Sequence, residues 1–306
     1  IDSNIVRGTF DPVVGSTTAV DGLFINVMNG IRDDIDFEVR NNVFSNNSGE
    51  GVHLNTQADA SLAVDMRGNL IEGNGLNGIH LTGVEIVATD LETQGGTWVQ
   101  NVIRNNVLSG IQIDGVSGDV IPMIIGQNGA DPFTGESLGN LIEGNGGDGI
   151  EINSGGFVQI NNNIISANSG AGIDINASGI GLRTALLQNN SITRNQGDGL
   201  EILNRGTSIT TLVALGNSID NNLGRGVDLL NQGIGPFSGT ANLKFGDGTA
   251  AGMNRISSNG EEGFYVVTTA AGAQTQNLRT SVNYNPGAAD GSTGLAVAAG
   301  NEDGNS

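Results

Sequence analysis

The stretch from residue 140 to residue 152 reads NLIEGNGGDGIEI, and the stretch 163–175 repeats it as NIISANSGAGIDI. Two asparagines, a glycine and two hydrophobic residues around one variable residue keep their places while the other positions change. The pattern N-x-[IF]-x-x-N-x-x-x-G-[VILF]-x-[LIV] occurs eight times without a gap, and its glycines follow one another at intervals of 23 to 39 residues. Repetition with this period predicts a solenoid, in which each repeat packs only on its neighbours.

The template fixes three columns of residues. The first asparagines are Asn42, Asn69, Asn101, Asn140, Asn163, Asn190, Asn217 and Asn254. The second asparagines are Asn47, Asn74, Asn106, Asn145, Asn168, Asn195, Asn222 and Asn259. The glycines are Gly51, Gly78, Gly110, Gly149, Gly172, Gly199, Gly226 and Gly263. Degraded copies around Gly22 and Gly294 predict atypical coils at the two ends, where a stack lacks a neighbour.

Hydrophobic residues inside each repeat have period two, which is typical of short strands with one face buried. Ile150 and Ile152 alternate with Glu151, Val158 and Ile160 precede the next repeat, and Ile142 lies two residues after its asparagine. Three short strands in each repeat, with no helical pattern between them, predict an all-β parallel β-helix of about ten coils. We expect one domain over 1–306, with regular coils over about 37–267 and degenerate end coils over 1–36 and 268–306.

The two asparagine columns have a structural explanation. A tight turn leaves backbone groups that its own residues cannot pair, and an inward-pointing amide both donates and accepts. Identical amides stacked at the inter-strand spacing of about 4.8 Å are expected to form a hydrogen-bonded ladder along the axis. Glycine before the inward pair is expected to allow a positive φ at the corner and a close approach of coils.

On these residues the chain resembles the right-handed parallel β-helix superfamily, which has the pectate-lyase-like fold, over about residues 20–297. The resemblance implies that the strand after each glycine belongs to the first sheet, whose outer face carries the active site in the enzymes. The superfamily includes polysaccharide lyases, glycoside hydrolases and epimerases, but also tailspikes and adhesins without known catalysis. The resemblance therefore predicts the fold and leaves the function open.

Composition excludes several classes of partner. Among the 306 residues, 32 are Asp or Glu and 12 are Lys or Arg, which gives a formal charge of −20. A nucleic acid or an anionic membrane surface requires clustered basic residues, so neither is an expected partner. The chain has no cysteine and therefore no disulfide framework. It has no apolar run of about 18 residues, so we expect no membrane insertion.

The outward position two residues after each glycine holds the largest group of titratable side chains in one column. This column reads His53, His80, Gln112, Glu151, Asp174, Glu201, Asp228 and Tyr265. Four acids in consecutive coils repel one another at this spacing. Glu151, Asp174, Glu201 and Asp228, together with Asp114, are therefore the candidate residues for contact with a cation or a glycan. Three interpretations stay open, namely a solvated acidic strip, a strip that binds calcium, and a catalytic pair of the glycosidase kind.

The signatures that the resemblance leads one to expect in enzymes are absent. The only lysine, Lys244, falls in the insertion 231–253 and is expected to lie outside the regular coils. His53 and His80 are expected to be polar residues on a solvated face, with a metal or a proton as the alternative. The template places the insertions 82–97, 114–138 and 231–253 after the first sheet, which predicts a wall on one side only.

These observations favour a non-catalytic, secreted or cell-surface module that serves as a rigid or adhesive element. Its cofactors would be none, or calcium, and its partners a polysaccharide, other surface proteins, or further copies joined end to end. The alternative is a polysaccharide-active enzyme, a lyase or a glycoside hydrolase, that uses acids on the outer face of the first sheet with Arg104 or Arg194 nearby.

Overall fold

The structure is a computed structural model that describes fourteen segments of the chain. They are residues 1–9, 19–27, 35–56, 62–83, 96–114, 123–153, 156–178, 182–205, 209–232, 242–246, 252–268, 277–280, 282–284 and 295–299. Gly294 of the last degraded copy and parts of the three expected insertions lie outside these residues, whereas Leu295–Ala299 after Gly294 are described. None of the described residues is helical, and no described helix could cross a membrane.

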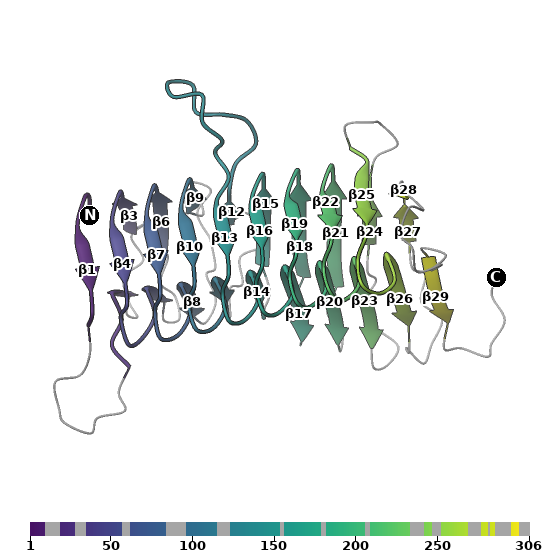
Figure 1. Ribbon diagram of the computed structural model, residues 1–306, viewed down its shortest axis with the longest axis horizontal. Coiled ribbons are helices and arrows are strands. Elements are labelled where there is room, and N and C mark those ends of the chain that lie inside the picture. The colour runs from purple at the N-terminus through teal and green to yellow at the C-terminus, as the bar shows by residue number, and fades with distance from the viewer. Residues whose placement is uncertain are drawn as a thin grey trace.

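The chain winds as a right-handed parallel β-helix whose strands form three sheets (Figure 1). Sheet A contains β3 (Ile35–Arg40), β6 (Leu62–Arg67), β9 (Thr97–Val99), β12 (Met123–Ile125), β15 (Gly156–Asn161), β18 (Leu182–Gln188), β21 (Ile209–Leu215), β24 (Asn242–Phe245) and β27 (Asn277–Thr280). Sheet B contains β1 (Ile5–Arg7), β4 (Val43–Ser45), β7 (Leu70–Glu72), β10 (Val102–Arg104), β13 (Leu141–Glu143), β16 (Ile164–Ser166), β19 (Ser191–Thr193), β22 (Ser218–Asp220), β25 (Asn254–Ser257) and β28 (Val282–Tyr284). Sheet C contains β2 (Leu23–Val27), β5 (Val52–Thr56), β8 (Ile79–Gly83), β11 (Ile111–Ile113), β14 (Ile150–Ile152), β17 (Ile173–Ser178), β20 (Leu200–Arg205), β23 (Val227–Gln232), β26 (Phe264–Thr268) and β29 (Leu295–Ala299).

Each coil passes through sheets A, B and C in that order, as the sequence predicts. Sheet A has nine strands, so the described residues form nine complete coils, one fewer than the expected ten. β1 and β2 begin a further, incomplete coil, in which Arg40 of β3 donates its backbone N–H to the carbonyl of Ile1.

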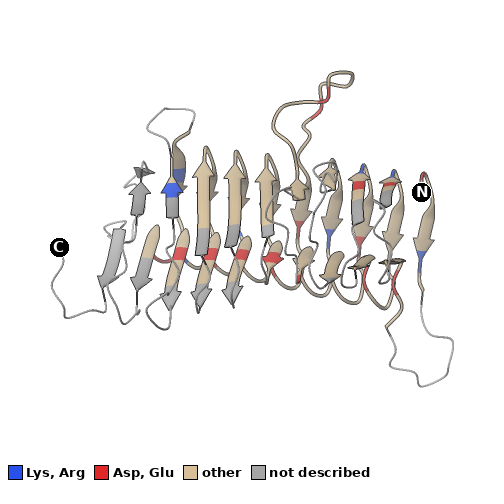
Figure 2. Cartoon of the chain, turned by 180° about the vertical axis from the view of Figure 1, so that it is seen from behind, with Lys and Arg blue, Asp and Glu red and all other residues tan. Residues whose placement is uncertain are grey.

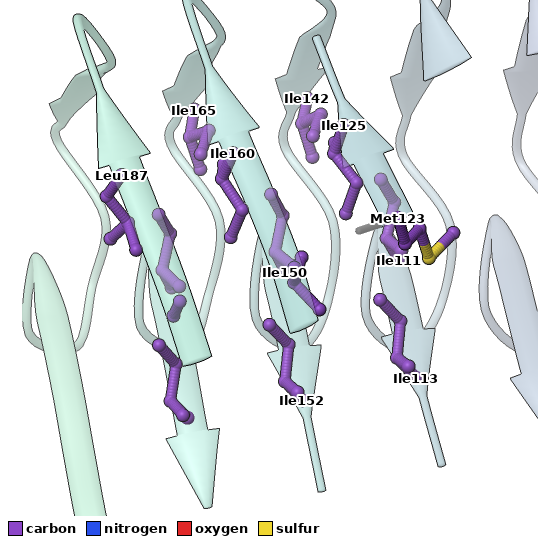
Figure 3. Close-up of a cluster of buried hydrophobic side chains, with 14 of the residues drawn as sticks. Ile111, Ile113, Met123, Ile125, Ile142, Ile150, Ile152, Ile160, Ile165 and Leu187 are labelled. Carbon is purple, nitrogen blue, oxygen red and sulfur yellow. The ribbon is translucent and has the colours of Figure 1, made fainter. Parts of the chain in front are cut away.

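Inward side chains of the three sheets fill the interior as stacked rows (Figure 3). In one coil Ile142, Ile150 and Ile152 are all buried, and the next coil places Ile165 directly beside Ile142 in register. Burying one such side chain stabilises the fold by roughly 1.5–3 kcal/mol relative to exposure. Because equivalent residues pack on one another, the template has to recur in every coil.

Both predicted asparagine ladders are confirmed. From Asn42 to Asn254 and from Asn47 to Asn259, the amide of one ladder asparagine donates to the Oδ1 of the next along the axis, as Asn140 does to Asn163 at 2.9 Å and Asn145 to Asn168 at 2.9 Å. The same Oδ1 also accepts the backbone N–H of the preceding asparagine, at 2.9 and 3.0 Å in these two cases. The structure extends the ladders to Asn4 and Thr9, which the template does not identify.

Of the two reasons expected for the template glycines, the positive φ is wrong and the close approach of coils is confirmed. Gly149 and Gly172 do not have a positive φ. Instead a Cβ on Gly149 would lie 2.6 Å from the carbonyl oxygen of Gly172 and 2.4 Å from a methyl carbon of Ile165. Close approach of successive coils therefore requires glycine here. The positive φ falls just before each second asparagine, for example at Ala167 and Arg194.

Two expectations about the insertions are also wrong. β12 lies inside the expected insertion 114–138, and residues 127–139 form a projecting loop between β12 and β13, at the corner of sheets A and B (Figure 1). Lys244 belongs to β24, which pairs with β21 and β27 in sheet A, and so it lies in a regular coil. The template runs from the first asparagine through the sheet B strand to the sheet C strand and leaves the sheet A strand unmarked, so it cannot tell whether an insertion falls before or after that strand.

Candidate functional site

The outer face of sheet C carries the predicted column in register. Glu151 of β14, Asp174 of β17, Glu201 of β20 and Asp228 of β23 are direct neighbours on four consecutive strands. Figure 2 shows the acidic residues side by side on these neighbouring strands. Flanking inward residues such as Ile150 and Ile152 anchor each strand, which turns the residue between them outward.

A second row of acids lies in the turn that precedes sheet C. Asp148 and Asp198 occupy the position just before the template glycine, and each accepts a backbone N–H from the following coil. Burial raises the pKa of Asp148 to about 6, and the charge of Glu151 adds to the rise. The sequence shows Asp198, Arg225 and Glu262 as a column of alternating charge at this position, but it does not identify Asp148 as part of this turn row of acids. Its signal is an acid directly before the glycine in several repeats.

Glu201 lies at the centre of this acidic surface. Burial raises the pKa of Glu201, and the charges of Asp198, Asp228 and Asp148 raise it further. Asp228 is 4% exposed, and burial raises its pKa as well, although Arg225 opposes the shift. A carboxyl group with a raised pKa retains its proton at a higher pH, which suits a proton donor.

Arg225 lies at the end of the acidic row that is nearer to β26. It donates from Nη1 to Oδ2 of Asp228 at 2.9 Å and from Nε to Oε2 of Glu262 at 2.9 Å. Its guanidinium also lies 4.0 Å from the centre of the Tyr265 ring. The four consecutive acids have no base among them, as the sequence shows, but Arg225 in the turn row bonds to the last of them, Asp228.

The other half of the face is a hydrogen-bonded histidine network rather than a solvated surface. His80 places Nδ1 3.1 Å from Oε1 of Glu50 and Nε2 2.8 Å from Oδ2 of Asp114. Burial alone would lower the pKa of His80, but the hydrogen bonds to Glu50 and Asp114 outweigh it and raise the pKa. Because ionised carboxylates only accept, two carboxylate partners favour the form of His80 in which both ring nitrogens carry a proton.

Asp114 joins the two halves of the face. The amide of Asn153 donates to Oδ1 of Asp114 at 2.9 Å and to Oε1 of Glu151 at 2.7 Å. Ser109 donates its hydroxyl to the other oxygen of Glu151 at 2.9 Å. Of the five predicted residues, Asp114 therefore lies beside His80 and Glu151, whereas Asp174, Glu201 and Asp228 continue the row away from it.

The described residues give calcium no ready site. Within the described ranges no three His, Cys, Asp or Glu side chains are grouped so that they could hold a metal ion. Asp114, Glu151 and Asp228 instead bond to amide, hydroxyl or guanidinium donors. The calcium strip stays a prediction.

Comparison with known proteins agrees with this architecture. The family described as "Right handed beta helix region" matches residues 36–222, which is more than half of the chain. The chain belongs to the right-handed β-helix family. No curated protein matches this β-helix in sequence.

Similar solved structures include a point variant of the periplasmic alginate epimerase AlgG and the pectate lyase Pel9A. The epimerase is 14% identical with a TM-score of 0.44, and the match covers 84% of this β-helix and 55% of that chain. The lyase is 14% identical with a TM-score of 0.38, and the match covers 78% of this β-helix and 62% of that chain. This β-helix thus spans between about half and two thirds of their lengths, and the likeness concerns the fold alone.

Asp148 makes the stability of this β-helix depend on pH. Its pKa is raised in the folded state, so the folded chain binds the proton more tightly than the unfolded chain and loses this advantage as the pH rises through about 6. Asp148→Asn keeps an oxygen to accept the N–H of Ala171 and removes the charge. We expect this substitution to raise the free energy of unfolding by about 1–3 kcal/mol at pH 8 and to leave it unchanged near pH 3, below the unfolded pKa of 3.8.

Urea unfolding of the wild type and this variant at the two pH values measures the effect. A stabilisation of equal size at both pH values would contradict a charge effect and would indicate a packing effect. Asp65→Asn on the exposed side of sheet A is the control, because Asp65 is an outward acid away from the acidic rows.

Proposed function

We propose that the chain is a polysaccharide-active enzyme that cleaves glycosidic bonds on the outer face of sheet C. The observation that carries the proposal is the pairing of Asp174 with Glu201, neighbours in register of which Glu201 has a raised pKa. Strands in a sheet lie about 4.8 Å apart, close to the roughly 5–5.5 Å that separates the two carboxyl groups of retaining glycosidases.

In the proposed reaction each of the two acids has its own role. Glu201 holds its proton and gives it to the glycosidic oxygen, which leaves with the electron pair of the broken C1–O bond. Asp174 adds its carboxylate to C1 and forms a glycosyl ester. Glu201, now ionised, then takes a proton from water, and the hydroxide so formed displaces Asp174 from C1.

The charge of the face indicates the class of substrate. Besides the column, Asp148 and Asp198 surround Glu201, and Arg225 is engaged with Asp228 and Glu262. A polyanion would be repelled along the whole row. We therefore infer a polysaccharide without carboxylate groups. This expectation separates the substrate from alginate and pectate, the polymers named for the two similar structures.

The proposal is tested on purified neutral, amino-sugar and acidic polysaccharides by measuring new reducing ends and unsaturated products. We expect reducing ends from a polymer without carboxylates, and no unsaturated sugars. Cleavage of the acidic polymers alone, or no new ends from any polymer, would refute it.

The non-catalytic module has no observation in the described residues that favours it over the enzyme. An extracellular or cell-surface location, end-to-end association and calcium binding stay proposals. Calcium is tested by thermal unfolding with millimolar calcium against excess chelator. A melting temperature that calcium raises, and that Asp174→Asn with Glu201→Gln makes insensitive, would support a cation strip.

A further inference from the structure

Phe24 begins the outward column of sheet C, one coil before His53. β2 is the edge strand of the sheet, and Phe24 pairs in register with His53 of β5. Its side chain is 54% exposed, although the ring is large and apolar. The same face that carries Asp174 and Glu201 thus begins with an exposed aromatic ring.

The Phe24 ring packs on a stack of two histidine rings from the next two coils. The Phe24 and His53 ring centres are 4.9 Å apart at 46°, and His53 stacks on His80 at 5.2 Å and 12°. Asp21 and Thr82 each lie 3.1 Å from a ring nitrogen of His53. The histidine planes are therefore fixed by hydrogen bonds, and Phe24 rests on a rigid support.

Amide groups lie in the outward position next to the ring. Asn26 of β2 is exposed, and Asn55 donates to its Oδ1 at 2.9 Å. An apolar ring beside polar amides matches a sugar, which has an apolar C–H face and hydroxyl groups at its rim. The aromatic residue at the opposite end of the column differs, because Arg225 covers the ring of Tyr265.

We propose that Phe24, Asn26 and Asn55 form a sugar-binding subsite at the N-terminal end of the sheet C face. One sugar ring of the polysaccharide stacks on Phe24, and its hydroxyl groups bond to the two amides. The subsite rests on the proposed function, because it binds a distant sugar of the same substrate. Phe24 and Glu201 are six strand spacings apart, or about 29 Å, so only chains of about six sugars or more reach both.

The test compares Phe24→Ala with Phe133→Ala. Phe133 is the matched control, because it is 95% exposed but lies at the tip of the loop between sheets A and B. On the polymer we expect Phe24→Ala to raise KM about fivefold with kcat unchanged. On oligosaccharides of about three sugars, too short to span the distance, it should have no effect. Phe24→Trp should restore the low KM.

The outcomes separate the subsite from the reaction. Wild-type cleavage with equal KM for Phe24→Ala and Phe133→Ala overturns the subsite and leaves the proposed function intact. An equal loss on short and long substrates also overturns it, since this result means that Phe24 acts on the fold or the reaction centre. A wild-type protein that neither binds nor cleaves any polysaccharide overturns both.

Discussion

Glu201→Gln is expected to lower kcat on the cleaved polysaccharide by a factor of about 10²–10⁴, the usual contribution of a positioned general acid. Glutamine keeps the size and hydrogen-bonding oxygen of Glu201 but has no proton to give to the leaving group. Because burial and neighbouring acids raise the pKa of Glu201, its charged form is unfavourable in the folded chain. The variant should therefore unfold at the same or a higher temperature than the wild type.

Loss of turnover without loss of stability is the diagnostic combination. Glu143→Gln is the control, because Glu143 is an outward acid of β13 in sheet B that lies 4.0 Å from Arg104. We expect this control to keep the activity of the wild type. Turnover by Glu201→Gln at the level of the control would exclude Glu201 as the acid.

Asn168→Ala is expected to lower the free energy of unfolding by about 3–5 kcal/mol. Oδ1 of Asn168 accepts both the backbone N–H and the amide of Asn145, at 3.0 and 2.9 Å. The substitution leaves these two buried donors unpaired. It also removes the hydrogen bond that the side-chain amide of Asn168 donates to Oδ1 of Asn195. An unpaired buried donor costs about 1–3 kcal/mol.

Urea unfolding followed by circular dichroism measures the loss, and Gln196→Ala is its control. Gln196 is an exposed amide one residue after Asn195, so its replacement should change stability by no more than about 0.5 kcal/mol. Equal effects of the two substitutions would show that the ladder does not hold the coils together.

The features that repeat were predictable, because one template position becomes one column in space. Eight copies of the asparagines identified both ladders, and the position two residues after each glycine identified the acidic row from Glu151 to Asp228. Phe24 was also within reach, since Gly22 and Leu23 align it with His53. It was missed because the first copy lacks its asparagines at the expected distance, and Asn4 and Thr9 replace them from farther upstream.

Features that depend on contacts between columns could not be predicted. The approach of Arg225 to Asp228 and the position of His80 between Glu50 and Asp114 join residues at different template positions. Such contacts depend on how far one column is displaced along the axis relative to the neighbouring column. The sequence does not give this displacement. The loop at 127–139 was misplaced because β12 has only three residues and no template marks it.

The anomeric configuration of the first product, followed by NMR during cleavage, tests the paired acids most directly. Asp174 and Glu201 lie one coil apart, a strand spacing of about 4.8 Å, which is shorter than the roughly 6.5–9.5 Å between carboxyl groups that leaves room for the water of inverting enzymes. With paired acids, we expect the product to appear first with the configuration of the bond that was cleaved. A product that appears first with the inverted configuration would contradict it.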